Sequence, residues 1–222
     1  MSLALLGSLE VISLQIDLTL WGVWTAEIEV DADDVPLGAT SIAIGVEGAA
    51  PATFSGTVLE SGGFLGRARA FMVGGAGGLR RALPPRQYHL APPKMVIGDI
   101  VREAGEKAGD FSTLEKLSVL PRWVRSAGSG LSSLAVVCGR LGIPWRVCRD
   151  GSVRAGPEKW PSYRGSVDLL ESNGAFGRAL AAQDAPDLEP GLLVEGRRLG
   201  RVVHIVAEGG VFRSEIHFER ES

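Results

Sequence analysis

The sequence has little of what disulfide frameworks, metal sites and aromatic binding surfaces are built from. Its 222 residues include two cysteines, three histidines and a 6% share of aromatic residues. Small secreted domains held by disulfides usually carry more cysteines than this. We therefore expect Cys138 and Cys148, both in apolar surroundings, to be buried free thiols.

Long hydrophobic runs are also missing. The most apolar stretch lies near the N-terminus, where Glu10, Gln15 and Asp17 interrupt it. This excludes a membrane span of about 20 apolar residues there. The first residues also lack the basic segment that opens a signal peptide. We expect a chain without a membrane span that is made, and at first stays, in a cytoplasm.

Charge of one sign does not dominate, because 23 Lys and Arg face 26 Asp and Glu for a net charge of −3. Binding to a phosphate backbone depends on clustered positive charge. The pairs Arg80-Arg81 and Arg197-Arg198 are short and isolated, so we interpret both as solvated surface. Nucleic acid is therefore not expected as the main partner.

Apolar and polar residues alternate along the first third of the chain. Side chains of a strand point to alternate faces of a sheet, so the pattern predicts half-buried strands. Short strands separated by turn residues are typical of a sandwich or barrel. The predicted strands are Ile12–Leu20, Trp24–Val30, Ile42–Val46, Thr53–Leu59 and Arg67–Val73, with turns at Asp31–Gly38, Glu47–Pro51 and Ser61–Gly63.

A run of glycines at 74–78 raises the question of a phosphate-binding loop. Such a loop needs a helix directly behind it, commonly opened by Gly-Lys-Ser/Thr. Pro84 and Pro85 prevent a helix soon after these glycines. We predict a flexible loop between strands at this position.

The character of the chain changes after Ala91-Pro92-Pro93. Apolar residues recur every three or four positions from Ile97 to Ala108, which predicts an amphipathic helix ended by Gly109. A second helix is predicted over Gly130–Leu141, capped by Ser129 and closed by Gly142. Its expected buried stripe is Leu131, Leu134, Cys138 and Leu141.

Hairpins follow in the rest of the chain. Asp150-Gly151 between two apolar runs predicts the first of them. Glu208–Gly210 separates Arg201–Ala207 from Phe212–Phe218, whose Phe212, Ile216 and Phe218 should face a core. The sequence thus predicts a mainly β protein with a small α+β insertion. Two β-barrel-like domains, residues 1–92 and 161–222, would flank a helix and hairpin module at residues 93–160.

Residues with catalytic or metal-binding chemistry do not form a recognisable motif. His204 and His217 could meet across the last hairpin, with Glu215 or Glu219 as a third ligand, but we expect both histidines on a solvated face. Asp31, Asp33 and Asp34 lack the twelve-residue calcium loop and fit a turn. No catalytic, cofactor-binding or metal-ligating residue is predicted, and no cofactor.

Taken together, the segments resemble the tail-hub (late control, baseplate hub) family of contractile-tailed bacteriophages. In that family a first barrel leads into a helix, then a helix, glycine, Trp-Arg strand and Asp-Gly turn, and then a second barrel. The segments that carry the resemblance are Phe71–Leu79, Val96–Gly105, Leu134–Gly151, Gly156–Trp160, Pro190-Gly191 and Gly200–Val206.

The resemblance implies a structural protein rather than an enzyme. Hubs of this family are trimers whose subunits each carry two similar barrels, so that six barrels form a ring between a sixfold tail tube and a threefold spike. The implied place is the distal end of a virion tail, assembled in the host cytoplasm. The implied partners are two further copies, a tail tube or distal tail protein, a separate spike protein and a tape-measure protein.

Two other classes of function remain open from the residues alone. A carbohydrate or cell-wall binding module would present a surface row of aromatic side chains. A hydrolase would require His204 or His217 for its activity.

Overall fold

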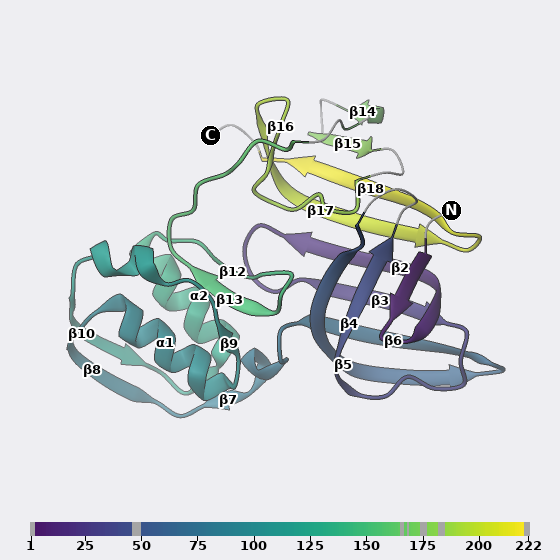
Figure 1. The fold of residues 1–222 in the computed structure, drawn as a ribbon. Coiled ribbons are helices and arrows are strands. Elements are labelled where there is room, and N and C mark those ends of the chain that lie inside the picture. The colour runs from purple at the N-terminus through teal and green to yellow at the C-terminus, as the bar shows by residue number, and fades with distance from the viewer. Residues whose placement is uncertain are drawn as a thin grey trace. The chain divides into compact units, whose positions relative to one another are not determined.

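The computed structural model describes residues 3–45, 50–164, 167, 169–173, 177–181 and 185–219 (Figure 1). The chain forms two compact units. Unit 1 combines residues 1–73 with 159–222, and unit 2 is the intervening segment 74–158. The first boundary therefore lies at Gly74 rather than after residue 92, and the two β-rich regions share one unit.

The regular elements of unit 1, where it is described, are all strands. Apolar residues at every second position favour extended backbone with one buried face. The strands are β1 Leu3–Leu6, β2 Leu9–Thr19, β3 Thr25–Val30, β4 Gly38–Gly45, β5 Ala52–Phe64, β6 Arg67–Gly74, β14 Leu169–Asn173, β15 Arg178–Ala181, β16 Leu193–Val194, β17 Arg197–Ala207 and β18 Val211–Phe218.

The first six strands close into a barrel. Their order is β1-β4-β5-β6-β3-β2, and a pairing of β1 with β2 completes the ring. The inward side chains are fully buried and include Ile16, Ile42, Phe54 and Met72. The ring closes through Leu9 and Glu10 of β2 alone, so the barrel encloses its own core while the rest of that edge of β2 stays open to another strand.

The C-terminal strands extend the same sheet from β2. Leu9 and Glu10 of β2 pair with β1, whereas Leu14–Thr19 pair with β17 along the same edge. The order continues as β2-β17-β18-β15-β14, with β16 also on β17. As predicted, Phe212, Ile216 and Phe218 face the core. Within the described residues these strands form an open sheet.

Two local features of unit 1 differ from the prediction. A bulge between Val11 and Ser13 shifts the alternation of β2, so Val11 is buried in place of Ile12. Strand β5 also runs through the predicted turn at Ser61–Gly63, where Gly63 lies too close to the Asp33 carbonyl for any side chain. The reversal comes instead at Leu65-Gly66, both with positive φ.

Unit 2 is a small α/β unit. Its elements are η1 Gly78–Arg80, β7 Ala82–Leu83, β8 Arg86–Ala91, α1 Pro93–Ala104, β9 Lys107–Ala108, η2 Ser112–Lys116, β10 Leu120–Arg125, β11 Gly128–Ser129, α2 Gly130–Leu141, β12 Trp145–Val147 and β13 Ser152–Ala155. Strands β8 and β10 form a two-stranded ribbon, and β12, β13 and β9 form a second sheet. The predicted hairpin around Asp150-Gly151 is confirmed as β12–β13.

The two helices were predicted with different success. Helix α2 has the predicted bounds, with the Ser129 hydroxyl accepting from the Ser132 amide at 3.1 Å and Gly142 left-handed at φ 63°. Leu131, however, is 40% exposed, and Val137 takes its place in the core. Helix α1 ends at Gly105 rather than Gly109, because Gly105 adopts φ 79°.

Gly56 generates a prediction about barrel packing. An added Cβ there would lie 2.3 Å from the Val73 carbonyl oxygen and 2.9 Å from the Trp24 ring. Overpacking of this kind costs about 1–3 kcal/mol, so Gly56→Ala should lower the free energy of unfolding by about that amount. Urea denaturation followed by tryptophan fluorescence measures the change. Gly62→Ala, in the same strand but with nothing within 4 Å, is the matched control; equal losses in both variants would contradict the packing.

Candidate functional site

The glycine-rich segment folds around a carboxylate of its own chain. Glu106, which is 8% exposed, follows the end of α1. Its two oxygens accept hydrogen bonds from the amides of Ala76 at 2.8 Å, Gly78 at 2.7 Å and Leu79 at 3.1 Å. Successive backbone amides form a concave site for an anion. Here the Glu106 side chain already occupies that site.

This arrangement corrects the predicted flexible loop. Gly78 must lack a side chain because its Cβ would lie 1.8 Å from the Ala104 carbonyl oxygen, and Gly75 has φ 76°. The glycines therefore allow close approach between the segment and the end of α1. Three amides of the segment donate hydrogen bonds to Glu106. These bonds hold the first turn of unit 2 in place.

The histidines of the last hairpin do not converge. His204 is completely buried, with Nδ1 2.8 Å from the Ser214 hydroxyl and Nε2 3.0 Å from the Leu188 carbonyl oxygen. His217 lies next to Glu215, at 2.6 Å. The register places His204 opposite Ser214 and His217 opposite Arg201. The expectation that His204 is solvated was wrong, because the β2–β17 pairing turns that face inward.

The other predicted candidates are also in structural positions. Cys138 and Cys148 are free thiols, and burial raises the pKa of Cys138 to about 12, which leaves a poor nucleophile. Asp34 accepts from the Val35 amide at 2.8 Å in the connection between β3 and β4. The described residues contain no cluster of three or more His, Cys, Asp or Glu suited to a metal ion. In the described parts of the chain no helix is long and apolar enough to cross a membrane.

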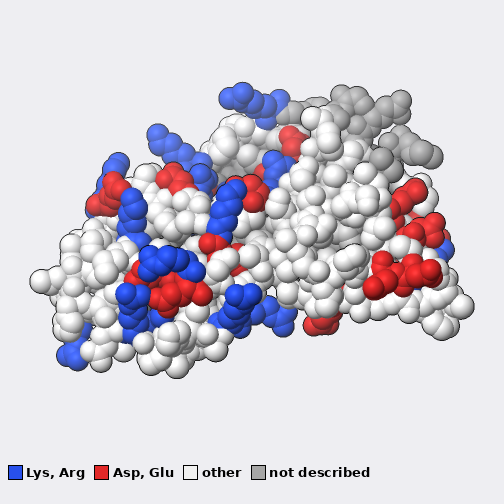
Figure 2. Space-filling model, turned by 60° about the horizontal axis from the view of Figure 1, so that its bottom comes forward, with Lys and Arg blue, Asp and Glu red and all other residues white. Residues whose placement is uncertain are grey.

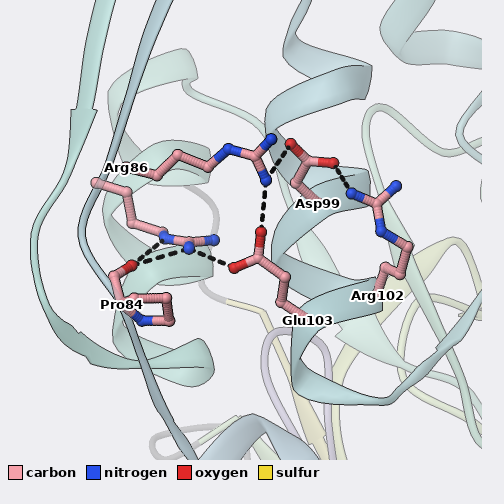
Figure 3. Close-up of polar contacts among 6 residues, drawn as sticks. Pro84, Arg86, Asp99, Arg102 and Glu103 are labelled. Carbon is pink, nitrogen blue, oxygen red and sulfur yellow. Dashed lines mark hydrogen bonds and ion pairs between the residues drawn. The ribbon is translucent and has the colours of Figure 1, made fainter.

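A network of ion pairs fastens the β8–β10 ribbon to α1 (Figure 3). Arg86 of β8 lies 2.6 Å from Glu103 and 3.0 Å from Asp99. Arg125 of β10, 2% exposed, pairs with Glu103 and donates to the Pro84 carbonyl oxygen at 2.9 Å. Arg102 pairs with Asp99 at the exposed end of the network. Sequence reasoning missed this cluster because its members come from three separate segments.

The outer face of unit 1 carries an open groove of about 890 Å³. It lies over β17, β2, β3 and β6, whose directly paired residues Ile205, Gln15, Glu27 and Phe71 form one row across the strands. Paired residues share a face of the sheet. Ile205 and Phe71 are half-buried, so the floor of the groove is partly apolar.

The lining of the groove is acidic. Four glutamates line it against one arginine: Glu27, Glu29, Glu60 and Glu208 against Arg69. The whole of unit 1 follows this sign, with 19 acidic and 10 basic residues, while unit 2 has 7 acidic and 13 basic residues. Figure 2 shows Lys and Arg gathered over unit 2 around one acidic cluster. Unit 1 therefore carries a net charge of −9 and unit 2 a net charge of +6.

Glu106 gives a prediction for unit 2. Hydrogen bonds to a charged group contribute about 1.5–3 kcal/mol each, and truncation leaves buried amides unsatisfied. Glu106→Ala should therefore lower the free energy of unfolding by about 3 kcal/mol, and Glu106→Gln by less, because one acceptor oxygen remains. Chemical denaturation measures both. Glu115→Ala, which removes an exposed partner of Lys94, should change stability little; a loss as large as that of Glu106→Ala would contradict the role given to Glu106.

Glu103 gives a prediction for pH dependence. Burial raises the pKa of the Glu103 carboxyl, whereas hydrogen bonds from Arg125 and Arg86 lower it. The combined lowering is the larger effect, so the pKa lies below the ordinary 4.5. The ionised carboxylate therefore stabilises the fold above about pH 4.5, and this contribution is lost as the pH falls through the lowered pKa. Glu103→Gln should reduce the melting temperature at pH 7, and the difference from the parent should shrink below pH 4. A difference that is constant from pH 7 to pH 3 would argue against the network.

No protein-family model and no curated protein matches the sequence. Solved structures do match its fold. The Escherichia coli c3393 protein, a type VI secretion system component described as structurally similar to the bacteriophage T4 tail proteins gp27 and gp5, aligns with 99% of this chain and 77% of its own. The identity is 10% and the TM-score 0.68.

Two tail proteins align over nearly the whole of both chains. The 43 kDa tail protein of prophage MuSo2 from Shewanella oneidensis gives a TM-score of 0.68 at 10% identity. The tail protein from Neisseria meningitidis MC58 gives 0.64 at 11%. Each alignment covers 99% of this chain and 96% of the other. The predicted resemblance to phage tail hubs is thus confirmed as a likeness of fold.

Proposed function

We propose that this chain is a structural hub protein at the distal end of a phage tail. The observation that carries the proposal is the likeness in fold to phage tail proteins over 99% of the chain. The sequence segments that resemble the hub family span both units, so residues and fold support the same reading. Assembly would take place in the host cytoplasm.

The proposed mechanism is one of symmetry. Each copy supplies two β-elements, the closed barrel β1–β6 and the sheet of β14–β18 that continues from β2. We propose that the second element acts as the second barrel-like lobe. Three copies then present six lobes in a ring, which matches a sixfold tube on one side and a threefold spike on the other. A ring of head-to-tail contacts closes without leaving a free interface.

The separation of charge supports such contacts between copies. Unit 1 is negative and unit 2 positive. Complementary surfaces speed association and fix its register. In the proposed ring, unit 2 of one copy offsets the negative charge of a neighbouring unit 1. The proposed external partners are a tail tube or distal tail protein, a spike protein and a tape-measure protein.

The alternatives gain no specific support from the structure. Of the two histidines that a hydrolase would require, His204 is buried and bonded to Ser214 and Leu188, and His217 lies beside Glu215. A glycan-binding surface would need a row of exposed aromatics. Among the described residues, the aromatic side chains that are clearly exposed are Trp21, just after β2, and Phe64, at the end of β5, so they do not form a row along one strand.

The mass in solution tests the proposed assembly. Light scattering at micromolar concentration should give three times the 23.4 kDa of one chain. Because the contacts are partly electrostatic, the trimer should weaken as the salt concentration rises. A monomer at every concentration, together with binding to cell-wall glycans, would overturn the hub proposal in favour of the binding module.

A further inference from the structure

The hairpin of β5 and β6 ends in an unusual turn. Its two central residues are Leu65, with φ 51°, and Gly66, with φ 79°. Turns with positive φ at both positions strongly favour Asn-Gly or Asp-Gly. A bulky side chain such as leucine is rarely found in the left-handed region. The chain therefore holds Leu65 in a backbone conformation that its side chain disfavours.

The same turn also exposes its apolar side chains. Leu65 is 85% exposed and Phe64 is 78% exposed, the highest values among the large apolar residues that the structure describes. Neither the conformation nor the exposure is compensated by the described residues of unit 1. When a local rule is broken without a gain in the folded chain, the expected reason is contact with another molecule.

The acidic groove of unit 1 is suited to receive this tip. The floor of the groove is partly apolar, with Phe71 and Ile205. The open groove has a volume of about 890 Å³, which is ample for one phenylalanine and one leucine side chain. Two of the four glutamates that line the groove, Glu29 and Glu208, already pair with Arg67 of the same copy, so the fit between tip and groove is one of apolar surface. Gly62 and Gly66 have open space around them, which keeps the tip slender.

The tip cannot enter the groove of its own copy. The groove begins at Arg69 and Glu60, on the same two strands that lead to the turn. Arg67, directly after the turn, is already fixed by Glu29 at 3.2 Å and Glu208 at 3.1 Å. A hairpin closed by a two-residue turn cannot fold back onto its own strands. The groove of a second copy is free of this restriction.

We propose that Phe64 and Leu65 of one copy insert into the groove of the next copy, head to tail. This inference rests on the proposed hub function and names the contact that would close its ring. The tip and the groove are different surfaces of one chain, so the contact is heterologous and can repeat around a closed ring. Buried aromatic anchors of this kind dominate the affinity of interfaces.

The test compares the mass in solution of the full chain and three variants by sedimentation. Phe64→Ser with Leu65→Asn removes the apolar tip and introduces an Asn-Gly turn, so this tip variant should fold at least as well as the parent. Gln15→Trp fills the groove from its floor. Leu37→Ser, at another exposed leucine of unit 1, is the matched control. Thermal melting confirms that each variant is folded.

The expected results are specific. The parent and Leu37→Ser form trimers, while the tip variant and the groove variant dissociate at concentrations where the parent is assembled. Loss of the two anchors should weaken association by about 100-fold. A mixture of the tip variant and the groove variant should form a two-chain complex and nothing larger, because one intact tip and one intact groove remain.

Other results would overturn the inference. A tip variant that remains a trimer with unchanged affinity rejects the contact but leaves the hub function in place. A tip variant that remains a trimer but no longer binds another tail protein also rejects the contact between copies, since the tip would then contact that other protein. A mixture that forms no complex rejects the head-to-tail geometry. A monomeric parent rejects the ring itself, and with it both proposals.

Discussion

The pairing of β2 with β17 is the interaction on which the rest of the structure depends. One edge of β2 is shared between β1, which closes the barrel, and β17, which starts the C-terminal sheet. On the outer face the two strands are further joined by Arg201 and Asp17, 2.7 Å apart at Nε and Oδ1. Because this pairing joins residues far apart in sequence, the segment between them forms a unit of its own, and the two β-rich regions become one.

The groove that is proposed to receive the tip depends on this shared edge. The outer face over β17, β2, β3 and β6 exists as one continuous groove only because β17 continues the sheet beyond β2. The β5–β6 hairpin reaches past it and ends in a strained, exposed apolar turn. Unit 2 is held differently, by the carboxylate of Glu106 within the glycine segment and by ion pairs between α1 and the β8–β10 ribbon. The tip and the groove of the proposed contact therefore lie on strands of unit 1, whereas hydrogen bonds and ion pairs to charged groups stabilise unit 2.

The sequence predicted the local elements best, because their signals lie within a few residues. Helix α2 was predicted to the residue, since Ser129 and Gly142 mark both ends. For α1, the position of Ala108 in the apolar repeat predicted a helix end at Gly109. The helix ends earlier, at Gly105, because that glycine adopts a left-handed conformation. The partners of Glu106, the burial of His204 and the extension of the sheet from β2 depend on contacts between distant segments. Alternation alone does not say which face of a strand meets which neighbour.

The proposal that three copies present six β-lobes is tested most directly by electron cryomicroscopy of the purified assembly. It predicts a closed ring with threefold symmetry, in which each copy contributes one barrel and one lobe built from β14–β18, in alternation around the ring. A twofold dimer, or a threefold ring with only three β-lobes, would contradict it.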